Sequence, residues 1–195
     1  MILIGQYDSP FTRRVAIALK LYGLAFEHRP WSTFGDADKI APYQSAAAGA
    51  DAGASTDGEA LIESTAILDY LDELVGPDEG DDRGAAGRSA ATPLKICALA
   101  TGLGDKAVSL IYERVLRKDA AETLGRALRG ADRRRAGDAG GASAPRSHTP
   151  YWFGERIGHA DIAVACVLRF TAEAHPHAVR RRALRFYGAL GVTDR

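Results

Sequence analysis

Apolar positions change their spacing along the chain, and the spacing predicts the elements. Residues 2–7 form a short apolar run that is typical of a buried strand. A helix is predicted over residues 10–22, where one face is apolar at i, i+3, i+4 and i+7: Val15, Ala18, Leu19 and Tyr22. Residues 25–29 are predicted to form a second strand. The strand–helix–strand order favours a right-handed βαβ unit.

A second group of elements follows the turn signal Asp57-Gly58. Residues 59–62 are predicted to form a short strand and residues 64–75 a helix, which Gly76-Pro77 ends. The residues of this helix that are expected to face the core are Ile67, Leu71, Leu74 and Val75.

The rest of the chain predicts helices without strands. Residues 78–92 are rich in Gly, Ala and Asp and are interpreted as a linker. Long helices are predicted over residues 93 to about 117 and 159–174. The residues of the first of these helices that are expected to face inward are Ile96, Leu99, Leu103, Ala107, Leu110 and Ile111. Residues 118–148 and 177–195 carry no apolar stripe and are expected to be loosely packed.

The length of 195 residues allows one large domain or two small ones, and either can bury a core. We expect an α/β domain over residues 1–77 and an all-α domain over residues 93–195. A hydrophobic content of 46% and a charged content of 26% are ordinary for a soluble globular protein.

Charge and cysteine content disfavour several functional classes. Lys and Arg equal Asp and Glu at 25 each, so no net field attracts nucleic acid or an anionic membrane. No apolar run is long enough to span a membrane. Cys97 and Cys166 lie far apart, in no metal-binding spacing, and are expected to be buried thiols in a reducing compartment. We therefore expect a cytoplasmic protein without nucleic-acid, membrane or metal partners.

The first candidate for chemistry is the segment Tyr7-Asp8-Ser9-Pro10-Phe11. It places a hydroxyl where the first strand gives way to a helix, at the positive end of the helix dipole. A thiolate beside Ser9 would accept hydrogen bonds from that hydroxyl and from free backbone N–H groups, which would lower the thiol pKa. A serine N-cap explains the same Ser-Pro pair without any chemistry, and the motif taken alone favours that interpretation.

Two further motifs lie at helix starts. Glu63-Ser64 opens a helix whose backbone donors suit the carboxylate of a ligand, although an N-cap with an acidic neighbour explains the pair more simply. Gly158 is interpreted as the N-cap of the last helix, with the Asp161 carboxylate bonding back to it as a folding element. His159 is expected at the surface.

The pieces SPFTRRV, ESTAILDYLDEL and GERIGHADIAVA, in this order after a first strand, resemble serine-type, bacterial-like members of the glutathione S-transferase family. The resemblance covers roughly residues 1–40, 57–77, 93–117 and 150–176. It implies a thioredoxin-like N-terminal domain that binds glutathione, and a helical C-terminal domain that supplies the pocket for a small electrophile. It also implies a cytoplasmic homodimer that acts in detoxification.

The resemblance also implies which residues form the site. The residues that it places at glutathione are Ser9, Phe11, Glu63 and Ser64. Ser9 matches the catalytic hydroxyl, and Glu63 and Ser64 match the pair that holds the γ-glutamyl end. Glutathione is then a co-substrate, and no cofactor is expected. Tyr112 and Arg114 either line the electrophile pocket or belong to a packed helix face.

Residues 43–56 depart from the family pattern. The family has here an Asn-Pro-Leu segment, then Val-Pro with a cis proline, then a core strand, and the backbone beside that proline pairs with glutathione. This chain has YQSAAAGADAGAST, without valine or proline, and such a Gly/Ala-rich stretch fits poorly inside a sheet. We therefore expect the third strand to be missing or irregular.

A shifted reading frame would explain this departure. Read from the second base of each codon, with permitted third-base choices, Tyr43 to Ala54 can encode INPLRRVPTLVL, which is close to the missing segment. The same shift turns residues 177–190 into a family-like helix, TLFDAARYASTALS. We hypothesise a transferase gene read through compensating frameshifts, and the codons for residues 43–54 test this directly.

Two functions are compatible with these residues. The first is transfer of the glutathione thiolate to small electrophiles. The second is a catalytically impaired transferase-like remnant, or a binding or scaffold module, because residues 43–56 lack the proline. Retention on glutathione resin is the observation that distinguishes them most cheaply.

Overall fold

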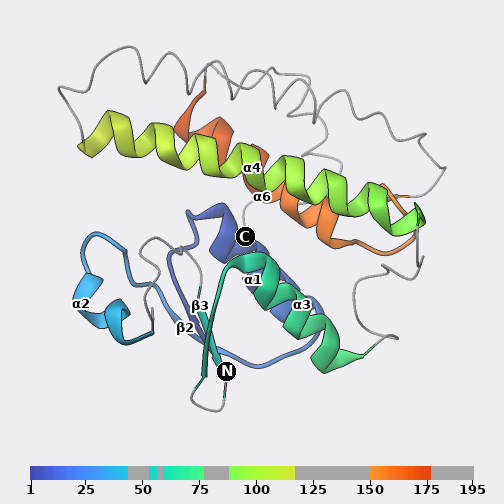
Figure 1. Ribbon diagram of the computed structural model, residues 1–195, viewed down its shortest axis with the longest axis horizontal. Helices are drawn as coiled ribbons and strands as arrows, with labels where there is room; N and C mark the ends of the chain where they lie inside the picture. Colours follow the sequence, from blue (N-terminus) through green and yellow to red (C-terminus); the bar gives the residue numbers. More distant parts are fainter. Residues whose placement is uncertain (44–52, 57–58, 77–87, 117–149, 177–195) are drawn as a thin grey trace. The chain divides into compact units, whose positions relative to one another are not determined.

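A computed structural model gives the fold in two compact units, Met1–Ala85 and Ala86–Arg195 (Figure 1). The residues that it describes are 1–43, 53–56, 59–76, 88–116 and 150–176. The first unit contains the sheet and the second contains the long helices, which confirms the predicted fold class. The division falls within the predicted linker, while the exact domain limits of 1–77 and 93–195 stay predictions.

The N-terminal unit is built on a four-stranded mixed sheet. Its strands are β1 (Ile2–Ile4), β2 (Glu27–Arg29), β3 (Gly53–Thr56) and β4 (Glu59–Ile62), in the order β2-β1-β3-β4. β1 pairs in parallel with β2, whereas β3 is antiparallel to both β1 and β4. This is the thioredoxin-like topology that the resemblance implied. β1 is shorter than predicted because Gly5, at φ 132°, takes the chain out of the extended conformation.

A third strand, β3, is present, so the expectation that it would be missing was wrong, while the alternative of an irregular strand over residues 48–54 falls mostly outside the described residues and stays a prediction. Ala54 is paired with Leu3 on one side and with Leu61 on the other. Backbone groups make the ladder, and Gly, Ala, Ser and Thr all supply them, so two flanking strands can hold a segment of weak strand propensity. Residues 44–52 lie outside the described part of the chain, and the frameshift hypothesis stays a prediction.

Two helices of the N-terminal unit, α1 (Pro10–Leu21) and α3 (Ser64–Val75), pack side by side (Figure 1). Their shared core with β1 consists of Leu3, Val15, Ala16, Ala18, Leu19, Ile67, Leu68 and Leu71. Both helices begin where the sequence predicted, and Gly23 at φ 65° follows the end of α1 as expected.

Two side-chain hydrogen bonds show that α1 and α3 run in the same direction. The Arg14 Nη1 donates to the Ser64 Oγ at 3.4 Å, and the Tyr22 hydroxyl donates to the Asp72 carboxylate at 2.5 Å. Each pair is separated by 50 residues in sequence, so the two helices keep one register along their common length.

The same register explains why Leu74 is not in the core. At this offset the last residue of α1, Leu21, lies level with Leu71, and the final residues of α3 extend past α1. Leu74 is therefore 50% exposed, contrary to the prediction, and Val75 is only half-buried. Leu68 takes a core position that the prediction had not assigned.

The C-terminal unit contains two helices that lie side by side, α4 (Arg88–Leu116) and α6 (His159–Ala174) (Figure 1). Small residues at their contact allow close approach, and the cluster consists of Ile96, Ala100, Ala160, Ala163 and Val164. The helices run in parallel, because further along the His175 Nε2 lies 2.9 Å from the Ala107 carbonyl oxygen and Arg114 donates to the Ala174 carbonyl at 3.2 Å. Leu99 and Ile111, predicted inward, are half-buried.

The start of α4 corrects the predicted linker. Residues 88–92 are helical, and Pro93 lies inside the helix. Proline lacks only its own N–H, so near the start of the helix it removes a single bond to the carbonyl four residues earlier. Residues 118–148 and 177–195, predicted to be loosely packed, lie outside the described residues.

The start of α6 confirms one prediction and corrects another. The Gly158 N–H donates to the Asp161 Oδ2 at 3.0 Å, as predicted, and the Trp152 N–H donates to the Oδ1 at 3.1 Å. His159, expected at the surface, is only 7% exposed, because residues 159–167 are buried on every side of the helix. Cys166 is buried and Cys97 half-buried, and neither is in a disulfide.

In the part of the chain that the structure describes, no helix combines the length and the apolar character that crossing a membrane requires.

Candidate functional site

Ser9 is the N-cap of α1, as the sequence predicted. Its Oγ accepts hydrogen bonds from the backbone N–H groups of Phe11 and Thr12, each at 3.3 Å. Its own N–H donates to the Asp8 carboxylate at 3.0 Å, which fixes the turn between β1 and α1. The hydroxyl is thus held at a defined position five residues after the strand ends.

This geometry changes what Ser9 can offer to an anion. The backbone donors of Phe11 and Thr12 are occupied by the Ser9 oxygen, and Pro10 has no N–H at all. Because the Ser9 oxygen is accepting, its hydroxyl hydrogen is the donor that is left. A thiolate at this place would therefore meet one hydroxyl and the helix dipole, and not the group of free backbone donors that the sequence suggested.

The start of α3 offers the backbone donors that α1 lacks. Glu63 is its N-cap, and the Glu63 side chain makes no capping hydrogen bond. The first intrahelical bond runs from the Ile67 N–H to the Glu63 carbonyl at 3.0 Å, so the N–H groups before Ile67 have no partner within the helix. Those groups and the positive end of the dipole favour a bound carboxylate.

The backbone of Glu63 is strained. Its φ of 70° and ψ of 115° lie in a region that residues with a side chain rarely adopt. Such conformations cost about 1–3 kcal/mol and are found mainly where function needs them. The strain places an exposed carboxylate immediately before the first donors of α3.

Ser64 connects the two helix starts. It is buried, and its Oγ accepts from the Arg14 guanidinium of α1 at 3.4 Å. Arg14 lies five residues after Ser9, which corresponds to about 7.5 Å along the helix axis.

Arg14 is the site residue that the sequence interpretation missed. It is only 2% exposed, although arginine is among the residues least often buried. The available signal was its position, since it lies four residues before Ala18 on the apolar face of α1.

Phe11 contributes to packing. It is half-buried against the core cluster of α1, α3 and β1. Its N–H is bonded to the Ser9 Oγ, so a glutathione contact through that group would compete with the cap. A role for Phe11 in binding stays a prediction.

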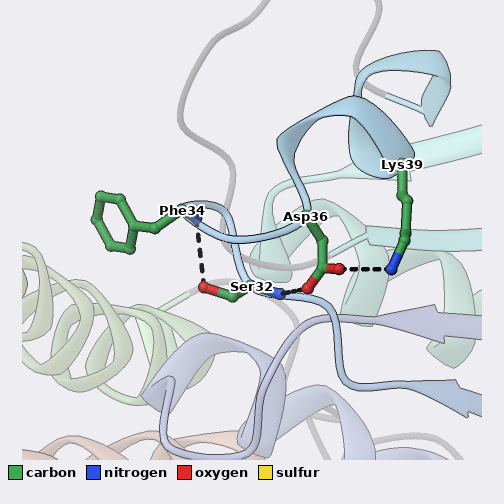
Figure 2. A network of polar contacts seen from close by, with 4 residues as sticks. All are labelled: Ser32, Phe34, Asp36 and Lys39. Atoms are coloured by element: carbon green, nitrogen blue, oxygen red, sulfur yellow. Dashed lines mark hydrogen bonds and ion pairs between the residues drawn. The ribbon is translucent and has the colours of Figure 1, made fainter.

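A polar network fixes the segment that follows β2. The Asp36 carboxylate accepts from the Lys39 Nζ at 2.6 Å and from the Ser32 N–H at 3.0 Å, and the Ser32 hydroxyl accepts from the Phe34 N–H at 3.3 Å (Figure 2). The hydrogen bond from Lys39, with the one from Ser32, lowers the pKa of Asp36 below its ordinary value. The network holds the start of the short helix α2 (Ala37–Ile40).

Next to this network, cations gather on an aromatic ring. The Arg29 guanidinium lies 5.3 Å from the Trp31 ring centroid, and the Lys39 ammonium lies 6.0 Å from it. Arg29 also donates to the Glu27 carboxylate at 2.7 Å and to the Tyr43 hydroxyl at 3.1 Å. The carboxylates of Glu27 and Asp36 pair with these two cations, so the cluster stabilises the conformation of the segment after β2.

The turn before Ser9 is supported from β2. The Tyr7 ring stacks on the His28 ring with a centroid distance of 3.9 Å and an interplanar angle of 8°. The His28 Nε2 lies 2.8 Å from the Gly5 carbonyl oxygen, which orients the imidazole. Partial burial raises the pKa of the Tyr7 phenol, so this hydroxyl is protonated at neutral pH.

Residues 8–74 match the family model for the N-terminal domain of glutathione S-transferases. The N-terminal unit is therefore similar to glutathione S-transferases. The match spans every site residue named above from Ser9 to Ser64, and it confirms the resemblance that the motifs carried.

Solved structures of glutathione transferases are similar in fold to this chain. A glutathione S-transferase from Methylobacterium radiotolerans JCM 2831, in complex with glutathione sulfonate, is similar with a TM-score of 0.79 at 21% identity, covering 98% of this chain and 90% of that one. A glutathione transferase family member from Pseudomonas fluorescens Pf-5 with bound glutathione gives 0.72 at 24% identity, covering 97% and 90%. Gtt2 from Saccharomyces cerevisiae gives 0.76 at 20% identity, covering 99% and 97%. No curated protein matches the sequence.

In the helical unit of this transferase-like chain, the two pocket candidates differ in what they touch. Arg114 is exposed and donates to the Ala174 carbonyl at the end of α6, which links α4 to α6, and its place in the pocket or on a packed face stays a prediction. Tyr112 is half-buried on α4, and a role in the pocket stays a prediction. Among the described residues, no group of three His, Cys, Asp or Glu side chains is arranged to hold a metal ion.

Proposed function

We propose that this protein binds glutathione between the starts of α1 and α3 and transfers its thiolate to small electrophiles. The observation that carries the proposal is the arrangement of charge at α3. The exposed Glu63 carboxylate comes immediately before the uncapped backbone donors of α3. The buried guanidinium of Arg14 contacts the next residue, Ser64. An α-amino-acid end carries an ammonium and a carboxylate, so it matches this pairing of a negative and a positive group. The γ-glutamyl end of glutathione has that chemistry.

Ser9 is proposed to act at the thiol. Its hydroxyl hydrogen is available because its oxygen accepts the two capping bonds, and a hydrogen bond to a thiolate lowers the thiol pKa. The thiolate then attacks the electrophile, and the leaving group departs with the displaced electron pair. Among structures with the same fold, the Pseudomonas fluorescens protein has bound glutathione, which supports this ligand class.

The proposal includes the further properties that the resemblance implied: a homodimer, a cytoplasmic location and a role in detoxification. Size-exclusion chromatography with light scattering checks the first of these. A single mass near 20.8 kDa would correspond to a monomer and would contradict it.

Two substitutions of Ser9 separate chemistry from capping. Ser9→Ala removes the hydroxyl and the cap, at about 1 kcal/mol of stability, whereas Ser9→Gly removes the hydroxyl but costs the cap only a few tenths. If the hydroxyl stabilises the thiolate, both variants should conjugate a generic aryl halide about ten- to a hundredfold more slowly. Equal rates in wild type and variants would remove Ser9 from the mechanism.

The alternative function is tested in the same assays. No proline lies between residues 43 and 76, so the chain lacks the proline beside which glutathione pairs in the family. A folded protein that is retained on glutathione resin without conjugating would be a binding or scaffold module. A folded protein that does neither would be a transferase-like remnant.

A further inference from the structure

Arg14 is a buried cation whose observed partner lies across the helix pair. Its side chain is on the face of α1 that packs in the core, where a charge is costly unless polar groups compensate it. One of these groups is the Ser64 hydroxyl, the first side chain of α3, which is itself 3% exposed. The distance of 3.4 Å is long for a hydrogen bond, so its importance for stability alone is small.

The bond nevertheless determines which way the Ser64 hydroxyl acts. A hydroxyl has one donor hydrogen and two acceptor lone pairs, and it rotates to suit its neighbours. Because guanidinium can only donate, the Ser64 oxygen must accept from Arg14, and its hydrogen is directed elsewhere. Ser64 is the first residue of α3, so its hydroxyl belongs to the same helix start as the uncapped N–H groups, and its hydrogen can be donated together with them.

We infer that Arg14 is a positioning residue for glutathione: it holds the Ser64 hydroxyl as a donor toward the carboxylate of the γ-glutamyl end. The inference rests on the proposed function. Arg14 does not touch the ligand; it orients Ser64 and adds positive charge behind it. Its effect is on glutathione affinity, because the sulfur chemistry at Ser9 takes place at the other end of the tripeptide.

The chain offers a matched control on the same two helices. Tyr22 and Asp72 form the second α1–α3 hydrogen bond, with the same sequence separation as Arg14 and Ser64 but near the far end of α3. Tyr22→Phe loosens the helix pair without reaching Ser64. A change that Arg14→Leu produces and Tyr22→Phe does not therefore comes from the start of α3.

The experiment measures the glutathione dissociation constant by calorimetry, and KM for glutathione and kcat with an aryl halide. Arg14→Leu is expected to raise both the dissociation constant and KM about tenfold, with kcat at saturating glutathione changed less than about twofold. Arg14→Lys keeps the positive charge but lacks the planar guanidinium, so its dissociation constant and KM are expected to lie between those of wild type and Arg14→Leu. Tyr22→Phe is expected to leave all three values at the wild-type level.

A double-mutant cycle isolates the part that passes through Ser64, since Arg14 makes other interactions as well. In a Ser64→Ala background, Arg14→Leu should change glutathione affinity less than about twofold, and Arg14→Lys serves in the cycle if the leucine variant does not fold. The inference about Arg14 would be overturned, with the proposed function left standing, by any of three results. These are additive effects of the Arg14 and Ser64 substitutions on glutathione affinity, unchanged glutathione affinity in both Arg14 variants, or an equal loss of glutathione affinity in Tyr22→Phe. A folded wild type that does not bind glutathione would overturn the proposed function, and the inference with it.

Discussion

Replacing Glu63 with glycine should stabilise the fold and weaken glutathione binding at the same time. Glu63 is the only described residue other than glycine with a positive φ. Its side chain makes no capping hydrogen bond, so removing it costs α3 no cap. Glycine accepts positive φ without the steric cost that a Cβ imposes.

The magnitude follows from three opposing effects. Relief of backbone strain is favourable by about 1–3 kcal/mol. The greater freedom of glycine in the unfolded chain costs about 0.4–1 kcal/mol. Loss of a negative charge near the positive end of α3 costs a further 0.3–1 kcal/mol, roughly. We expect Glu63→Gly to raise the free energy of unfolding by about 1 kcal/mol, or Tm by about 2–4 °C for a chain of this length.

Glu63→Gln is the matched control, because it removes the charge and keeps the strained backbone. Urea unfolding should show the glutamine variant slightly less stable than wild type and the glycine variant more stable than both. Calorimetry should show glutathione binding weakened about tenfold in both, since each lacks the carboxylate that would face the ligand ammonium. The reasoning fails if glycine is no more stable than glutamine, or if either variant binds glutathione as tightly as wild type.

Two further predictions concern carboxylates away from the proposed glutathione site. Asp161→Ala leaves the Trp152 and Gly158 N–H groups without their buried acceptor, so urea titration should show a free energy of unfolding lower by about 3 kcal/mol. A decrease below about 1 kcal/mol would contradict the role of Asp161 at the start of α6. The pKa of Asp36 is lowered by Lys39, so the stabilisation from this pair is complete above the ordinary carboxyl pKa and is lost as the pH falls below about 4. The difference in stability between wild type and Asp36→Asn should therefore shrink from pH 6 to pH 3, and a difference that grows on acidification would refute this sign.

The helices were predictable because their signals are local. Gly23 and Gly76 mark helix ends through a positive φ, and Ser9-Pro10 marks a helix start through the capping oxygen of serine and the preset φ of proline. These ends lie where the sequence predicted. The hydrogen bond from the Gly158 N–H to the Asp161 carboxylate was predictable for the same reason, since both groups belong to one helical turn.

Features that depend on a neighbouring element were not predictable. The exposure of Leu74 follows from where α1 ends, which the periodicity of α3 does not contain. His159 is buried because of what surrounds α6, although its polar side chain and first-turn position suggested the surface. The Arg14–Ser64 contact joins residues that are 50 positions apart, so no local pattern indicates it.

The two helix starts differ in a way that the sequence motifs conceal. Both show a serine before an apolar stripe, and each was compatible with an ordinary cap. At α1 the serine oxygen is committed to the backbone, and only its hydrogen remains. At α3 the backbone donors are uncapped, and the serine oxygen is committed to Arg14. The first arrangement suits one compact anion such as a thiolate, and the second suits a carboxylate that accepts several hydrogen bonds.

The difference between the two helix starts also bears on residues 43–56, where the chain departs from the pattern of the family that it resembles. Ser9, Arg14, Glu63 and Ser64 are positioned by α1, α3 and the strands that precede them, and β3 completes the sheet between β1 and β4 despite its sequence. The departure therefore leaves the two helix starts intact and removes the proline beside which the family pairs the middle of the tripeptide. Contacts to the ends of glutathione and contacts to its backbone are separate contributions to affinity. A chain that keeps the first and lacks the second should bind glutathione weakly, with an affinity that still depends on Glu63 and Arg14.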